Sequence, residues 1–179
     1  DGYMSVNDDI SFSIPNPQMI IPTGTKELTV SFWVRDWTNG YLLRIRESNL
    51  YFWEDPGYNF YFAMAGTEDS SYAFGPTSGD WHLVVAVFDQ TDAKLYIDRI
   101  SEFTVTTLKI PAGGFPDVSS DPAGLFCNPS SDSADHNFIG DVKDIRFYTT
   151  AFTAAEVMDL YLGETGCAAC PAGQPYTDP

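Results

Sequence analysis

The residues best suited to chemistry are aromatic side chains set among short polar ones. Asp36-Trp37-Thr38-Asn39-Gly40-Tyr41 is a predicted loop with an aromatic ring near each end, and Trp53 and Tyr58 are predicted to join the same rim. An aromatic ring stacks on a sugar ring, while nearby amides and carboxylates bond the sugar hydroxyls. The sequence therefore suggests a carbohydrate contact through Trp37, Asn39, Tyr41, Trp53 and Tyr58. The alternative is that Trp37 and Trp53 fill the edges of a core.

Residues for acid–base or nucleophilic catalysis are poorly arranged. The adjacent pairs Glu54-Asp55 and Glu68-Asp69 would point to opposite faces of a strand. His82 and His136 are the available bases, and neither is accompanied by a Gly-x-Ser-x-Gly turn. His82 follows a tryptophan at the start of an apolar run, which favours a structural role. No catalytic residue is assigned, and we expect the chain not to be an enzyme.

The cysteines are odd in number: Cys127, Cys167 and Cys170. At least one of them must pair outside this segment, stay free or bind something. The favoured interpretation is a disulfide from Cys127 to Cys167, which leaves Cys170 to pair further on. A zinc site is the rival, but a lone Cys-x-x-Cys is half of a zinc motif and no second pair follows.

The overall charge limits the partners. Nine Lys and Arg against 25 Asp and Glu give a net charge of −16, which excludes clustered phosphate contacts with nucleic acid. Acidity also disfavours attraction to an anionic membrane surface. No run of about 18 apolar residues is present, so we expect no direct membrane insertion. With 44% hydrophobic residues, the chain has enough apolar mass for one sizeable core.

The elements that would position these residues are almost all strands. Short runs rich in Val, Ile, Phe, Tyr and Thr alternate with Gly, Pro, Asn and Asp clusters, which is typical of an all-β protein. The strands are predicted at 28–35, 41–45, 50–53, 59–65, 83–88, 94–98, 103–108 and 142–148. Along the first of them, Leu28, Val30, Phe32 and Val34 should face the core. One helix is predicted from a capping box at Thr153 and Glu156 to about Leu162, ending at Gly163.

Three segments carry a family resemblance. In order and spacing they resemble the strand motifs of laminin G-like and pentraxin-like domains. The first is Glu27 to Val34, the second is Asp80 to Asp89 with Leu95 to Asp98, and the third is Phe138 to Tyr148 with Thr153 to Tyr161. The resemblance implies a concanavalin A-like jelly roll, a sandwich of two antiparallel sheets with one short C-terminal helix. Residues 1–163 would form this domain. The segment 164–179 would begin a Cys-rich extracellular module or a linker, because Cys167 to Gly173 resembles the opening of extracellular Cys-rich repeats.

The resemblance also implies a Ca²⁺ ion at the rim of the sandwich. Asp55 matches one family ligand, and Asp135, with Asp132 as a second choice, matches the other. Two positions depart from the family pattern. Arg99 replaces a turn glycine, and Lys143 replaces an aspartate. Any ion role at position 143 is therefore in doubt.

The function that follows is recognition. We expect an extracellular, secreted or cell-surface module within a larger multidomain chain that binds carbohydrate or an extracellular protein in adhesion. One alternative is a structural packing module of an extracellular filament, coat or matrix. A glycoside hydrolase is a distant alternative, because the Glu-x-Asp-x-x-Glu motif of hydrolases with this fold is absent.

Overall fold

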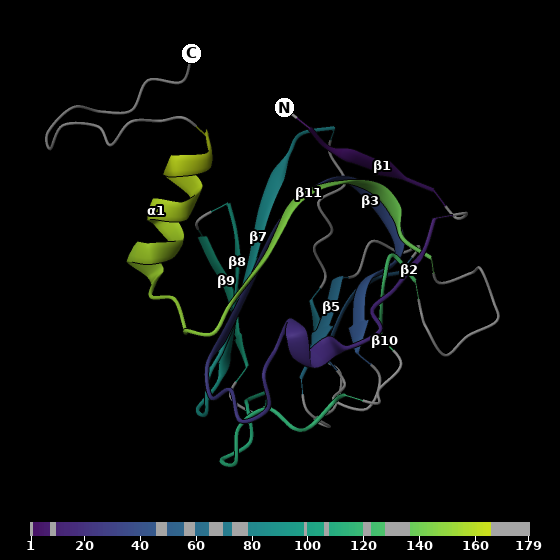
Figure 1. Ribbon diagram of the computed structural model, residues 1–179. Helices are drawn as coiled ribbons and strands as arrows, with labels where there is room; N and C mark the ends of the chain where they lie inside the picture. The colour runs from purple at the N-terminus through teal and green to yellow at the C-terminus, as the bar shows by residue number, and fades with distance from the viewer. Residues whose placement is uncertain are drawn as a thin grey trace, which may run out of the picture.

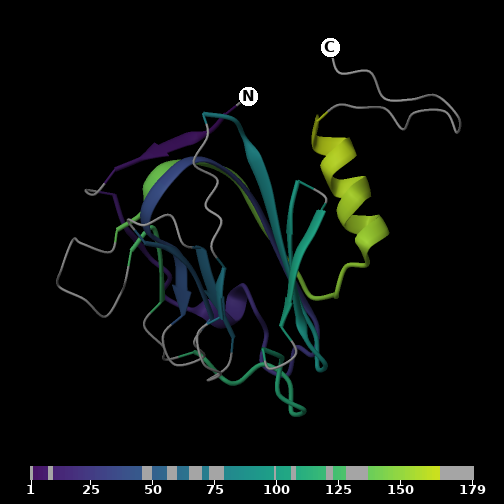
Figure 2. The ribbon, with the colours of Figure 1, turned by 180° about the vertical axis from the view of Figure 1, so that it is seen from behind.

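The computed structural model shows a β-sandwich with a helix packed on one side (Figure 1). The structure describes residues 2–7, 10–45, 50–55, 60–64, 70–72, 79–98, 100–105, 108–119, 123–127 and 137–165. The helix α1 lies against the face of β3, β7 and β8, on the side away from β4 and β5, and the view from behind shows the same layers (Figure 2). The predicted all-β architecture of antiparallel strands with one late helix is confirmed.

Two antiparallel sheets share one long strand, β3. Sheet A runs in the order β1(Met4–Val6), β11(Ile139–Tyr148), β3(Leu28–Ile45), β7(His82–Phe88), β8(Ala93–Ile97) and β9(Ile100–Val105). Sheet B runs in the order β2(Phe12–Ser13), β10(Ala123–Leu125), β3, β4(Leu50–Glu54), β5(Phe60–Ala63) and β6(Ser70–Tyr72). The 3-10 helix η1(Pro17–Met19) follows β2, and α1(Ala154–Thr165) follows β11.

The passage of β3 between the sheets corrects one prediction. Residues 36–41 are not a loop between two strands, because β3 is continuous from Leu28 to Ile45. Its first half pairs with β7 and its last residues pair with β4 and β10. The direction changes where Asp36 and Gly40 adopt positive φ values of 52° and 87°. Asp and Gly tolerate this conformation better than other residues, which explains why turn-like residues occur within a strand.

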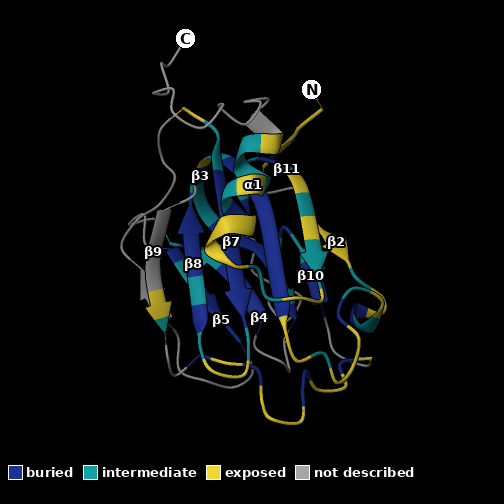
Figure 3. Ribbon diagram, turned by 90° about the vertical axis from the view of Figure 1, so that its left-hand side faces the viewer, coloured by how far each residue is buried: buried dark blue, intermediate teal, exposed yellow. Residues whose placement is uncertain are grey.

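The core lies between the sheets and is dominated by phenylalanine. Leu28, Val30, Phe32 and Val34 belong to it, as their alternation predicted. The largest fully buried aromatic side chains are Trp37, Phe32, Phe52, Phe60, Phe62, Phe88, Phe115 and Phe138. Sheet A is buried on its other face as well, where α1 covers β7 and β3 (Figure 3). Trp33 stacks there on Tyr161 of the helix with ring centroids 5.9 Å apart.

The start of α1 confirms the predicted capping box. The Thr153 backbone N–H donates to the Glu156 carboxylate at 2.7 Å, and the Glu156 N–H donates to Thr153 Oγ1 at 3.3 Å. These bonds lower the pKa of Glu156, because they favour its charged form. The predicted end of the helix was wrong, since α1 continues through Gly163 to Thr165.

His82 has the structural role that its sequence position favoured. Its Nδ1 lies 2.7 Å from Asp98 Oδ2, and the second oxygen of Asp98 accepts the Leu83 N–H at 2.9 Å. Asp98 adopts φ 51° at the end of β8. The histidine therefore ties the end of the β7–β8 hairpin together. Arg99, the predicted departure from the family turn, lies outside the described residues.

Candidate functional site

Trp37 does not lie in an exposed loop. Its side chain is 0% exposed and packs against Phe60 and Phe138, with ring centroids 5.4 and 5.2 Å away. Its indole N–H lies 3.2 Å from the carbonyl oxygens of both Asn39 and Gly40. A ring enclosed in this way cannot stack on a sugar. The assignment of Trp37 as a ligand contact is therefore corrected, and Trp37 fills the rim of the core.

Three other aromatic side chains form a stacked row across sheet B. Tyr41 on β3 pairs with Trp53 on β4, and Trp53 pairs with Tyr61 on β5. The Tyr41 and Trp53 rings stack at 5.7 Å and 21°, and the Trp53 and Tyr61 rings at 4.6 Å and 27°. We call these three residues the aromatic row. Cross-strand neighbours on one sheet face are brought together in this way.

The aromatic row lies on the outer face of sheet B. Phe52 and Glu54, the chain neighbours of Trp53, are fully buried on the core side, so Trp53 points the opposite way. Trp53 and Tyr61 are half-buried, whereas Tyr41 is only 8% exposed. The part of the row that a ligand can reach is therefore Trp53 and Tyr61. Sequence reasoning missed Tyr61, although the alternation of 59–65 places it on the face opposite Phe60 and Phe62.

Polar side chains stand at both ends of the aromatic row. Arg44 donates from Nη1 to the Tyr41 hydroxyl at 2.6 Å, and its guanidinium lies 4.8 Å from the Tyr41 ring centroid. At the other end, the Tyr61 hydroxyl donates to Asp55 Oδ2 at 3.2 Å. Asn39 is half-buried two residues before Tyr41 on β3, where it pairs with Ile139 of β11. The predicted residues Asn39, Tyr41 and Trp53 are thus close in β3 and β4, whereas Tyr58 lies outside the described residues.

The end of β4 holds polar atoms without partners. Within the described part of the chain, the buried side-chain polar atoms that lack a hydrogen bond are Trp53 Nε1 and both carboxylate oxygens of Glu54. Burial raises the pKa of Glu54 to about 8, with a smaller contribution from the nearby charge of Asp55. Unsatisfied groups of this kind are rare in proteins and often mark functional positions.

The predicted Ca²⁺ ligands do not come together in the described residues. Asp55 is present and half-buried, but Asp132 and Asp135 lie outside the described ranges. Glu54 faces the core while Asp55 bonds Tyr61 on the outer face, so these two carboxylates do not converge. Ca²⁺ requires about six to eight oxygen ligands, and in the described ranges no group of three or more His, Cys, Asp and Glu residues suits a metal ion. The described residues alone therefore do not fit Ca²⁺. Lys143 instead places its Nζ 4.6 Å from the Trp81 ring centroid.

Cys127 carries a free, half-buried thiol. Burial raises the pKa of this thiol above its usual value. The predicted disulfide from Cys127 is not shown in the described residues, where the Cys127 sulfur lies near Gly124. Cys167 and Cys170 lie outside the described residues.

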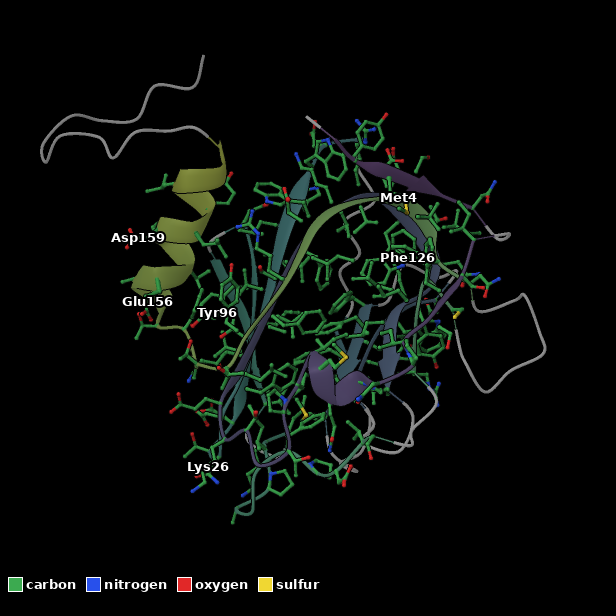
Figure 4. All side chains as sticks on the ribbon, in the orientation of Figure 1. Met4, Lys26, Tyr96, Phe126, Glu156 and Asp159 are labelled. Atoms are coloured by element: carbon green, nitrogen blue, oxygen red, sulfur yellow. The ribbon has the colours of Figure 1, made fainter. Side chains whose placement is uncertain are left out.

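A second surface lies at the edge of the sandwich. An apolar pocket of about 450 Å³ opens between β1 and β11 of sheet A and β2 and β10 of sheet B. Met4 and Phe12 on its walls are 42% and 47% exposed, and Figure 4 shows Met4 above Phe126 at this edge. Strand edges and apolar side chains that face solvent are typical of contact surfaces.

The fold and the outer face of sheet B define a lectin-like β-sandwich, and comparison with known families agrees. A laminin G family model, described as the concanavalin A-like lectin/glucanases superfamily, matches residues 6–158. The chain belongs to this superfamily. A search of curated proteins finds no match to this sequence.

Solved structures show the same fold at low sequence identity. Domain 4 of AbnA, a GH43 extracellular arabinanase from Geobacillus stearothermophilus in complex with arabinotriose, aligns with TM-score 0.65 and 18% identity over 88% of this chain and 75% of that one. A heptameric SAP-like pentraxin from Limulus polyphemus aligns with TM-score 0.57 and 14% identity over 88% and 84% of the two chains. A Trypanosoma rangeli sialidase aligns with TM-score 0.60 and 15% identity over 82% of this chain and 24% of that one. In the described ranges, no helix is long and apolar enough to cross a membrane.

Proposed function

We propose that this chain is an extracellular, non-catalytic carbohydrate-binding module whose ligand contacts the outward edges of Trp53 and Tyr61. The observation that carries the proposal is the aromatic row, in which the half-buried Trp53 and Tyr61 lie face to face on the outer side of a rigid sheet, with ring centroids 4.6 Å apart. The outward edges of two adjacent rigid aromatic side chains give a sugar apolar contact area at low entropic cost. Arg44 and Asp55 add charged hydrogen-bonding groups at the two ends.

The carboxylates support a binding role rather than hydrolysis. A glycosidase uses a pair of carboxylates about 5 to 9.5 Å apart that face one cleft. In this chain Glu54 and Asp55 face opposite sides of sheet B, and the strand motif with two same-face carboxylates does not occur in the sequence. The extracellular assignment, and the place of the module in a longer chain, are supported by the extracellular arabinanase whose domain 4 shares this fold.

A glycan array that carries neutral and acidic oligosaccharides tests the proposal, with calorimetry on any hit. Trp53→Ala should weaken binding to a hit by about tenfold or more, because truncation of a central aromatic contact has this effect. Tyr3→Ala is the matched control, since Tyr3 is a 53% exposed aromatic residue just before β1, away from the row. An array without binding, or equal affinity of the Trp53→Ala protein and the wild type, would contradict the proposal.

The edge pocket favours a second function, that of a protein-packing module. Met4 and Phe12 expose apolar surface beside the terminal strands β1 and β2. If this surface makes a contact between proteins, Phe12→Ser should abolish any concentration-dependent association seen by light scattering. Association that is absent in the wild type, or unchanged by Phe12→Ser, would remove this candidate.

A further inference from the structure

Arg44 differs from the other described arginines. Arg35 bonds Asp141, and Arg146 lies 3.7 Å from Asp144. Arg44 has no carboxylate partner among the described residues, although the chain holds 25 Asp and Glu. Its contacts are instead the Tyr41 hydroxyl and the faces of Tyr41 and Tyr51, whose ring centroids lie 4.8 and 5.8 Å from the guanidinium carbon. Within the described ranges, Arg44 is therefore a half-buried cation beside the aromatic row that makes no ion pair with a carboxylate.

The contacts of Arg44 hold the guanidinium in place without using most of its donors. A guanidinium carries five N–H donors, and the bond to Tyr41 is the one hydrogen bond made by the Arg44 side chain within the described ranges. Contacts with two tyrosine rings and one tyrosine hydroxyl restrict the side chain, so little further side-chain entropy is lost when an anion binds. A planar fork with free donors matches a carboxylate in bidentate geometry.

We propose that the sugar bound on the aromatic row carries a carboxylate, as a uronic acid does, and that Arg44 binds this carboxylate. The proposal rests on the proposed function, because it places the sugar ring on Trp53 and Tyr61 and its acidic substituent toward Arg44. Charge-assisted hydrogen bonds from a preorganised arginine are stronger than those of a neutral donor. Arg44 would thus decide which sugars bind.

Asp55 at the other end of the aromatic row does not oppose this arrangement. Arg44 pairs with Tyr51 on β4, and Asp55 follows Tyr51 by four residues, directly after the end of β4. At a rise of about 3.3 Å per residue, the two positions lie about 13 Å apart along the strand. This separation exceeds the screening length of about 8 Å at physiological salt. The two charges would therefore orient a bound uronic acid with its carboxylate at the Arg44 end.

The test is a glycan array that carries two pairs of sugars, each with an acidic and a neutral member. The first pair is oligogalacturonides and the same oligosaccharides with each carboxylate reduced to a hydroxymethyl group. The second pair is glucuronate-bearing and unsubstituted xylo-oligosaccharides. The wild type should bind the acidic member of at least one pair about tenfold more tightly than its neutral partner. Arg44→Gln should remove this preference, because it should lower affinity for the acidic partner about tenfold more than affinity for the neutral partner. Arg44→Lys should keep only part of the preference, because an ammonium cannot form the bidentate fork.

Arg146→Gln is the matched control, because it removes the same charge from the exposed face of β11. Two results would overturn the role of Arg44 while the proposed function stands. In the first, the wild type binds only the neutral member of each pair. In the second, Arg44→Gln and Arg146→Gln lose the preference for the acidic member equally. No binding to any member of the pairs would count against the proposed function itself, and the role of Arg44 would fall with it.

Discussion

Glu54 on β4 lies directly opposite Gly40 on β3, and its carboxyl group is enclosed in the core at 0% exposure. Gly40 offers no side chain to cover or bond it, and both carboxylate oxygens lack a hydrogen-bond partner among the residues that the structure describes. Burial disfavours the charged form, which explains the rise of the pKa of Glu54 to about 8. The folded protein therefore holds Glu54 protonated at neutral pH.

This burial predicts a loss of stability as pH rises. Below its unfolded pKa near 4.5, Glu54 is protonated in both states and contributes no pH dependence. Between that pH and about 8 the unfolded chain ionises while the folded chain stays neutral, so the free energy of unfolding falls. At pH 7 the loss is about 3 kcal/mol.

Glu54→Gln should remove this pH-dependent loss, and the substituted protein should unfold at a higher urea concentration than the wild type at pH 7 to 8. Below pH 4.5 the two midpoints should converge. Asp80→Asn, at an exposed position, should leave the wild-type profile unchanged. A wild-type midpoint that runs parallel to that of Glu54→Gln from pH 4 to 8 would show that Glu54 ionises normally.

Gly40 should not tolerate a side chain. A Cβ atom at this position would lie 1.9 Å from the Asn137 carbonyl oxygen, and its φ of 87° is unfavourable for other residues. Gly40→Ala should therefore lower the free energy of unfolding by about 2 to 4 kcal/mol. Gly79→Ala, where no atom lies within 4 Å, should change it by less than about 0.5 kcal/mol. Equal denaturation midpoints for the two variants would disprove the close approach of β3 and residue 137.

The Ca²⁺ site at Asp55, with Asp135 or Asp132, stays a prediction. If it exists, Ca²⁺ at about 100 times its dissociation constant should raise the melting temperature of the wild type by about 5 to 10 °C. Asp55→Asn should reduce this shift, whereas Asp80→Asn should not. Melting curves that are unchanged by millimolar Ca²⁺ would rule out the site.

Cys127 should react slowly as a free thiol. Because burial raises its pKa, little thiolate is present at pH 7, and the half-buried sulfur is poorly accessible. Iodoacetamide should label the peptide that contains Cys127 at least about tenfold more slowly in the folded protein than in urea. A peptide that links Cys127 to Cys167 in the non-reduced protein would contradict the free thiol.

Local pattern was sufficient for much of the fold. The alternation of Leu28, Val30, Phe32 and Val34 located the core face of β3, and the Thr153–Glu156 capping box located the start of α1. Both depend on residues a few positions apart, and such interactions are largely independent of the rest of the chain. The order of the family motifs extended these elements to a concanavalin A-like sandwich.

What only the tertiary structure decided is which aromatic residues face outward. Trp37 and Trp53 are equally plausible ligand contacts in the sequence, yet Trp37 is enclosed by Phe60 and Phe138 while Trp53 stacks with Tyr41 and Tyr61. The difference arises where β3 passes from one sheet to the other, at Asp36 and Gly40. Exposure of these side chains depends on strand pairing between segments far apart in the chain, and no local pattern specifies that pairing.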